Sequence, residues 1–166
     1  MGAREEPSMI RVDVEELAEK LESNAAELAE LIASFPLASR LESRGDAFSA
    51  VEHACHLRDL ERDGFTPRIR SVIVEDDPVL FDFDGAGVAA ASDYRAENAR
   101  AALNGFLEAR KVNVDALRTL PESGFLRVGH YEGRTPIMLG DVVAGMLDHD
   151  HDHLNRLRRM LAQTSG

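Results

Sequence analysis

The segment that most constrains the fold lies near the end of the chain, where apolar residues recur with the period of an α-helix. They lie three, four or eleven residues apart, and they are Val142, Met146, Leu157 and Met160. Continuing this stripe through its gap places His149 and His153 on the same face. Two imidazoles one helical turn apart on a buried face can bind one metal ion, provided that another helix supplies a third ligand.

The third histidine of this segment does not share that face. In LDHDHDHLNRL, from Leu147 to Leu157, His151 lies two residues from each of the other two histidines. At roughly 100° per residue it points about 200° around the helix from both of them. We therefore expect His151 to lie in solvent among aspartates, without a catalytic role, and take His149 and His153 as the relevant pair.

Four segments have the pattern of long amphipathic helices, and strand patterns are scarce. The expected helices are about Val12–Phe35, Ala47–Asp63, Ser92–Leu120 and Ile137–Gln163. Pro36 ends the first, Asp46 or Ser49 caps the second, and Gly64 ends it. We predict an all-α fold, a four-helix bundle forming a single domain over residues 1–166, with residues 1–9 flexible.

The connections contain weaker signals. Thr66 followed by Pro67 resembles a helix start, so we expect a further helix there, although the β-branched run Val72–Val74 could instead form a short strand. Residues 76–90 read as a loop. A long connection from Pro121 to Pro136 precedes the last helix, and Phe125–Val128 could be extended within it.

The third helix carries a charged residue on its apolar stripe. That stripe consists of Leu103, Leu107, Val114 and Leu117, and Arg110 falls among them. A buried guanidinium needs a carboxylate partner. We expect Glu61 or Asp59 to supply it.

The third metal ligand is sought on the second helix, where His53 and His56 lie three residues apart. Either or both could face inward, and periodicity alone does not choose between them.

The only cysteine is Cys55, so neither an intrachain disulfide nor a thiolate cluster can form. Nitrogen and oxygen atoms must therefore hold any metal ion, and Cys55 is expected to be a small buried residue.

Two motifs resemble a known family. The second helix reads FSAVEHACHLRDLE, an aromatic-Ser start followed by His-Leu and an acidic pair, and the last helix carries His-Asp-x-x-His-Leu from His149 to Leu154. Together with an FLEAR segment containing Arg110, they resemble the DinB-like (DinB/YfiT) four-helix-bundle metalloproteins over most of the chain. Phe48 stands where that family usually has tryptophan, and the Pro67 restart departs from its continuous second helix.

The resemblance implies an up-down-down-up bundle and a three-histidine site for one divalent ion, zinc or nickel, on His56, His149 and His153. It also implies a homodimer and, among the few assigned activities, S-transfer or isomerisation with a low-molecular-weight thiol. Three imidazoles leave a coordination position open, where a metal ion can activate water or a thiol. We therefore expect a metal-dependent S-transferase or hydrolase. The alternative is a non-catalytic, stress-related metal-binding bundle.

Other residues are candidates for supporting roles. His130, in the connection VGHYEG, could line the mouth of the site as an acid or base, and Glu61 and Arg110 are further catalytic candidates. Each ligating imidazole should donate its second N–H to an acceptor. The candidate acceptors are Glu52, Glu61, Asp150 and Asp152.

Composition excludes several classes of partner. The chain has 19 basic and 30 acidic residues, a net charge of −11, which would repel a nucleic-acid backbone. No apolar stretch approaches the roughly 18 residues typical of a membrane span, and the N-terminus lacks an apolar signal-peptide core. We expect a cytoplasmic protein that acts on a small-molecule substrate, without nucleic acid or membrane as partner.

Overall fold

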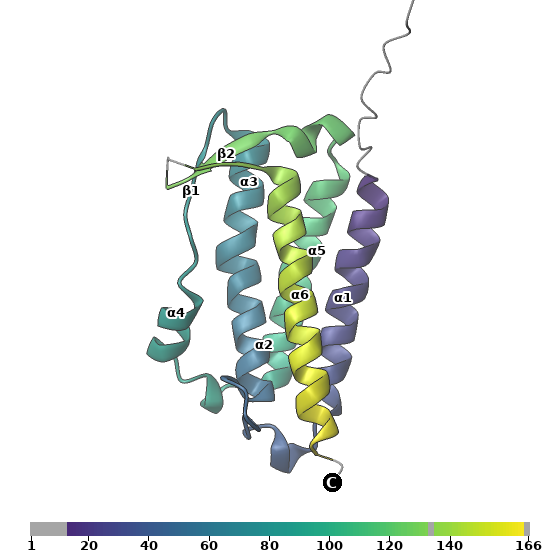
Figure 1. Ribbon diagram of the computed structural model, residues 1–166, viewed down its shortest axis with the longest axis vertical. Helices are drawn as coiled ribbons and strands as arrows, with labels where there is room; N and C mark the ends of the chain where they lie inside the picture. Colours follow the sequence, from purple (N-terminus) through teal and green to yellow (C-terminus); the bar gives the residue numbers. More distant parts are fainter. Residues whose placement is uncertain (1–12, 133–134, 165–166) are drawn as a thin grey trace, which may run out of the picture.

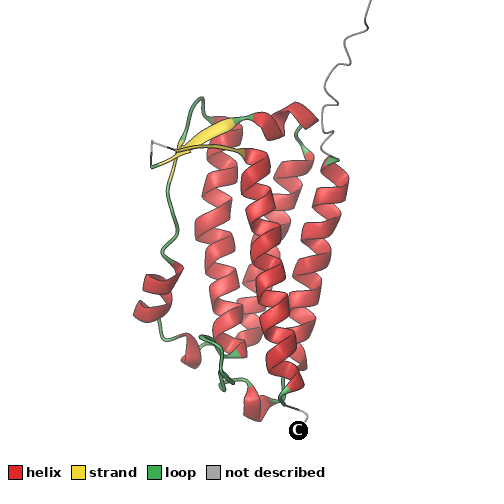
Figure 2. Ribbon diagram, in the orientation of Figure 1, coloured by secondary structure: helices red, strands yellow, loops and turns green. Residues whose placement is uncertain are grey.

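The computed structural model describes residues 13–132 and 135–164, so the expected flexible segment 1–9 lies outside the described residues. Four long helical segments stand side by side (Figure 1, Figure 2). They are α1 (Val14–Ser34), the segment from α2 to α3 (Ala50–Val74), α5 (Ala99–Arg118) and α6 (Leu139–Ala162). The predicted four-helix bundle is confirmed.

The directions of the helices can be read from contacts between them. Arg118, at the end of α5, pairs with Glu15 at the start of α1, so these two helices are antiparallel. Arg158, late in α6, pairs with Glu27 in the later half of α1, so α1 and α6 run the same way. The segment from α2 to α3 runs with α5, against α1 and α6 (Figure 1). This is an up-down-down-up arrangement.

The second helical segment is longer than expected. Beyond α2 (Ala50–Asp59) the backbone widens into a π-helical turn, η2 (Leu60–Phe65), and continues as α3 (Thr66–Val74). The prediction that Gly64 ends the helix is wrong, and so is the strand alternative for Val72–Val74. Pro67 lies in the first turn of α3, where the N–H that proline lacks is least needed, and the π-turn absorbs the change in hydrogen bonding.

Gly64 has a packing role in this continuous helix. It is buried, and a Cβ atom there would lie 2.7 Å from Leu60 Cδ1 and 3.2 Å from Phe83 Cβ. The missing side chain therefore lets the segment around Phe83 pack closely against the π-turn.

Helix starts follow the expected capping chemistry. Ser49, rather than Asp46, caps α2 in a capping box: its hydroxyl accepts the N–H of Glu52, and the Glu52 carboxylate accepts the N–H of Ser49. α5 begins after Asn98, later than predicted, because residues Tyr94–Ala96 form a separate 3₁₀ turn, η3.

A small sheet covers one end of the bundle (Figure 2), which the all-helical prediction did not include. Its strands are β1 (Val79–Leu80), β2 (Val128–Tyr131) and β3 (Thr135–Met138), in that order, with β1 parallel and β3 antiparallel to β2. The region expected to be a loop thus holds β1 and the short helix α4 (Gly85–Ala91). The predicted extended stretch is shifted, because Phe125 lies in a 3₁₀ turn, η4 (Glu122–Leu126).

The core consists of two apolar clusters with polar residues between them. One cluster includes Leu28, Phe106 and Leu157, and the other includes Leu21, Val114 and Met146. In the segment from α2 to α3, in α5 and in α6, the residues that separate the clusters include buried polar side chains. These are Glu61, Arg110, Asn113, Asp150 and His153. A polar layer therefore crosses the middle of the bundle.

Candidate metal centre

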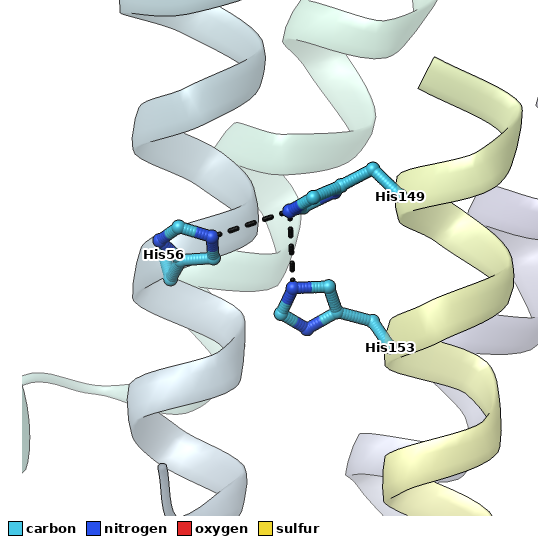
Figure 3. A group of neighbouring side chains, drawn as sticks. All are labelled: His56, His149 and His153. Carbon is cyan, nitrogen blue, oxygen red and sulfur yellow. Dashed lines mark hydrogen bonds between the residues drawn. The ribbon is translucent and has the colours of Figure 1, made fainter. Parts of the chain in front are cut away.

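Three histidines from two antiparallel helices meet in this polar layer. His56 projects from α2, and His149 and His153 project from α6 toward it (Figure 3). The Nε2 atom of His149 lies 3.3 Å from Nε2 of His56 and 3.1 Å from Nε2 of His153. One ligand atom from each residue lies within 4.8 Å of the others. The residues predicted as metal ligands are thus brought together.

The spacing of these nitrogens fits a metal ion. Zinc binds histidine nitrogen at about 2.0–2.1 Å with tetrahedral angles, which separates two ligand nitrogens by about 3.3 Å. The two Nε2 contacts of His149 are close to this separation. The donor set of three imidazoles also suits zinc or nickel.

Hydrogen bonding alone does not account for the contacts. A ring nitrogen carries either one proton or one lone pair, so the Nε2 atom of His149 can make one good hydrogen bond and not two. Nevertheless, it faces two other ring nitrogens at hydrogen-bonding distance. A cation at a common point would satisfy all three lone pairs at once.

The electrostatic environment keeps the rings neutral. Burial, reinforced by the neighbouring His56, lowers the pKa of His149 to about 3. Burial also lowers the pKa of His56 and, together with His149, that of His153 well below the usual range. At neutral pH all three rings therefore have a lone pair available for coordination.

Comparison with known proteins agrees with this geometry. The model of the DinB superfamily matches residues 20–157. The chain belongs to the DinB superfamily. A search of curated protein sequences found no significant match.

Among solved structures, the DinB-superfamily chain is similar to YfiT from Bacillus subtilis, described as a probable metal-dependent hydrolase with an unusual four-helix bundle topology. The two share 18% sequence identity, with a TM-score of 0.82 over 98% of this chain and 94% of that chain. At this identity the match supports the fold alone. None of the described helices is both long enough and apolar enough to span a membrane.

The three histidines differ in exposure. His153 is buried, whereas His56 and His149 are partly exposed and mark the open side of the group. The Phe48 ring lies 5.2 Å from that of His56, and the Phe65 ring lies 6.3 Å from that of His149. Each of the two partly exposed histidines therefore has an aromatic ring as a neighbour.

The first residue of α4, Gly85, also packs against the site. A Cβ atom on Gly85 would lie 2.8 Å from Cε1 of His56 and 3.3 Å from its Nδ1. Only glycine leaves the present space for the ring. The start of α4 thus restricts the position of His56 from outside.

Arg110 lies in a buried ionic network, as its position on the apolar stripe predicts. Its guanidinium bonds both oxygens of Glu61 at 2.9 and 3.0 Å, which confirms Glu61 as the partner rather than Asp59. It also bonds both oxygens of Asp150 at 2.8 Å and the carbonyl of Leu21 at 2.9 Å. Asn113 donates to Glu61 at 2.7 Å. These bonds favour a structural role for Glu61 and Arg110, whose catalytic role stays a prediction.

His53 lies behind the three histidines; the sequence predicted that His53, His56 or both face inward, and both do. It is fully buried, and its Nδ1 lies 2.7 Å from Nδ1 of His153. Its own Nε2 lies 3.5 Å from an oxygen of Asp46. The spacing of His53 and His56 allowed both to face inward without choosing between them, and nothing in the sequence indicated Asp46.

Other candidate residues lie elsewhere. His151 is exposed, as expected. His130 lies on β2, where its Nδ1 is 2.8 Å from Asp77, and it is not in the histidine group, so its role at the mouth stays a prediction.

The carboxylates considered as second partners of the ligand rings bond to other groups. Glu52 is in the α2 capping box, Asp152 pairs with Arg156 at 3.0 Å, and Glu61 and Asp150 bind Arg110. Among the described residues, the ring nitrogen that faces Nδ1 of His153 comes instead from His53.

Proposed function

We propose that the protein is a metal-dependent enzyme of the hydrolase or S-transferase type, in which His56, His149 and His153 hold one divalent ion, zinc or nickel. The observation that carries this proposal is the pair of Nε2 contacts at 3.3 and 3.1 Å around His149. The family and the fold shared with a described metal-dependent hydrolase support it.

The residues of the site have distinct tasks. The three neutral imidazoles would donate their lone pairs to the ion, and His56 and His149 are the partly exposed members of the group. The ion, when bound, would lower the pKa of a bound water or thiol toward neutrality. The rings of Phe48 and Phe65 lie beside those of His56 and His149 and would give a small electrophilic substrate an apolar contact there.

A thiol used in the reaction would have to come from outside the protein. Burial raises the pKa of Cys55 to about 12, and its sulfur contacts the carbonyl of Tyr94 rather than the histidines. The chain's only thiol is therefore a poor nucleophile. A low-molecular-weight thiol is the proposed cosubstrate if the reaction is S-transfer.

The test starts with metal content. The untagged protein is purified and its metals are measured, and then His153→Ala and the matched control His151→Ala, which changes an exposed residue on the same helix, are compared. We expect about one zinc or nickel per chain in the parent and in the control, and none in His153→Ala. The proposal would be contradicted if His153→Ala kept the ion, or if the parent contained no metal.

Turnover separates the enzyme from the binding protein. Libraries of hydrolysable esters and amides, and of electrophiles offered with low-molecular-weight thiols, are tested with the metal-loaded protein. Stoichiometric metal without turnover in any set would favour the alternative, a non-catalytic, stress-related metal-binding bundle. We also propose a single domain, a homodimer and a cytoplasmic location; gel filtration with light scattering tests the dimer.

A further inference from the structure

We propose that Asp46 and His53 form a relay that holds His153 in the tautomer with its proton on Nδ1, leaving the Nε2 lone pair aimed at the metal position. The consequence for metal binding rests on the proposed function. The tautomer itself does not, because it follows from the contacts among Asp46, His53 and His153 alone.

The first link is the contact between the two rings. Nδ1 of His53 and Nδ1 of His153 lie 2.7 Å apart, so one of them carries a proton that the other accepts. His53 is fully buried and His153 is 3% exposed, so water does not compete for this bond.

The second link decides which ring donates. The far nitrogen of His53, Nε2, is buried and has no hydrogen-bond partner among the described residues, but an oxygen of Asp46 lies 3.5 Å away. If Nε2 carried a lone pair, it would face the carboxylate as one acceptor faces another. A proton on Nε2 instead places the positive end of the N–H dipole beside the carboxylate charge, which favours it.

The tautomer of His153 follows from that choice. With its one proton on Nε2, neutral His53 presents a lone pair at Nδ1, so the proton between the rings belongs to Nδ1 of His153. Neutral His153 then has no proton on Nε2, the atom that lies 3.1 Å from Nε2 of His149. Through His53, Asp46 thus keeps the lone pair of His153 on Nε2, the atom that faces the metal position.

The position of Asp46 is itself fixed. Its Oδ1 accepts the N–H of Phe48 at 3.1 Å, just before α2, and lies 3.8 Å from Nη1 of Arg156 on α6. The carboxylate therefore contacts both helices that carry the three histidines. His56 has no such support, because its Nδ1 is buried without a partner among the described residues.

The test measures zinc affinity by competition with a chelator. His53→Leu removes the acceptor for His153, and we expect it to weaken zinc binding about 10- to 100-fold, the usual effect of losing a partner of a ligating histidine. His53→Gln restores an acceptor and should recover part of the loss. Asp46→Asn keeps an acceptor for the N–H of Phe48 but removes the charge, so a smaller loss is expected.

A second readout does not depend on the metal. Nitrogen-15 NMR of the parent, metal-free and zinc-loaded, should place the proton on Nδ1 of His153 and on Nε2 of His53. The opposite tautomers, or unchanged zinc affinity in His53→Leu, would overturn the relay. If His53→Leu does not fold, Asp46→Asn and the NMR spectra decide. A parent that binds no zinc or nickel defeats the proposed function, whereas the metal-free spectrum still tests the relay.

Discussion

The middle layer of this bundle contains two polar groups, the ionic network of Arg110 and the histidine group. They differ in how many of their donors and acceptors are hydrogen-bonded within the protein. All five N–H groups of Arg110 have acceptors, supplied by Glu61, Asp150 and the carbonyl of Leu21. The histidine group instead brings ring nitrogens to face ring nitrogens. A buried network that is complete is expected to serve the structure, and one that is incomplete is expected to bind something.

The complete network holds the incomplete one in place. Glu61 follows His56 by five residues on the same helical segment, and Asp150 directly follows His149 on α6. Arg110 bridges both carboxylates from α5 and also reaches α1 through Leu21. One guanidinium thus ties together the four helical segments and sets the register between the two that carry the histidines.

The sharpest test of this contrast replaces Arg110 with methionine. Arg110→Met leaves Glu61 and Asp150 buried without a counter-charge, so we expect a loss of about 3–5 kcal/mol in the free energy of unfolding. Urea unfolding followed by circular dichroism measures it. Arg118→Met is the control on the same helix, because the ion pairs of Arg118 with Glu15 and Glu22 are partly exposed, and its loss should be far smaller. Equal losses would refute the distinction.

The histidine group should respond in the opposite way. His149→Leu removes a partly exposed polar ring that is incompletely paired, so we expect little change in the unfolding free energy of the metal-free protein. Zinc at 100 times its dissociation constant should stabilise the parent by about 2.7 kcal/mol and the variant not at all. Thermal unfolding across a zinc titration measures this, with His151→Ala as control. Severe destabilisation of metal-free His149→Leu would mean that the histidines, too, are structural.

Helical periodicity was sufficient to predict which residues face the interior, because that depends on each helix alone. It placed His149 and His153 toward the interior, His151 in solvent and Arg110 in the core, although it left the partner of Arg110 open between Glu61 and Asp59. These inferences need only the direction of a side chain around its own helix, which the sequence fixes.

Features that depend on pairing between distant segments were missed. The strand β1 has two residues and pairs with β2 about 50 positions later, so no local alternation reveals it. Asp150 bonds Arg110 only because α5 and α6 meet there. Asp46 approaches His53 because the connection before α2 folds back beside that helix. Gly64 packs closely against Phe83, 19 positions later, which no local pattern reveals.

The pH dependence of the metal-free protein should distinguish the two groups further. Burial lowers the pKa of His149 to about 3 and that of His53 to about 4, from 6.5 in the unfolded chain. Below pH 6.5 the unfolded chain therefore binds more protons than the folded chain, so the free energy of unfolding decreases as the pH is lowered. The loss is expected to be about 1 kcal/mol per histidine over the first unit.

Urea unfolding of metal-free protein between about pH 7 and 5.5, the range in which the reference histidine pKa of 6.5 lies, measures this slope. His149→Leu is the matched control, since it lacks one of the titrating rings and should show a shallower decline. Equal slopes in parent and variant would show that His149 does not carry the effect.

The smallest expected effect comes from outside the polar layer, where Gly85 contacts His56. A Cβ atom in Gly85→Ala would lie 2.8 Å from Cε1 of His56, so either the ring or the start of α4 must shift. Because the buried Nδ1 of His56 has no partner among the described residues, packing is what holds this ring. We expect a several-fold weaker zinc affinity with little change in fold, measured by chelator competition.

Gly145→Ala is the control, at an exposed position of α6 with no atom within 4 Å of the new Cβ. It should bind zinc like the parent and gain about 0.5–1 kcal/mol in stability. If Gly85→Ala also binds like the parent, α2 and the π-turn alone position His56, and the start of α4 only covers it.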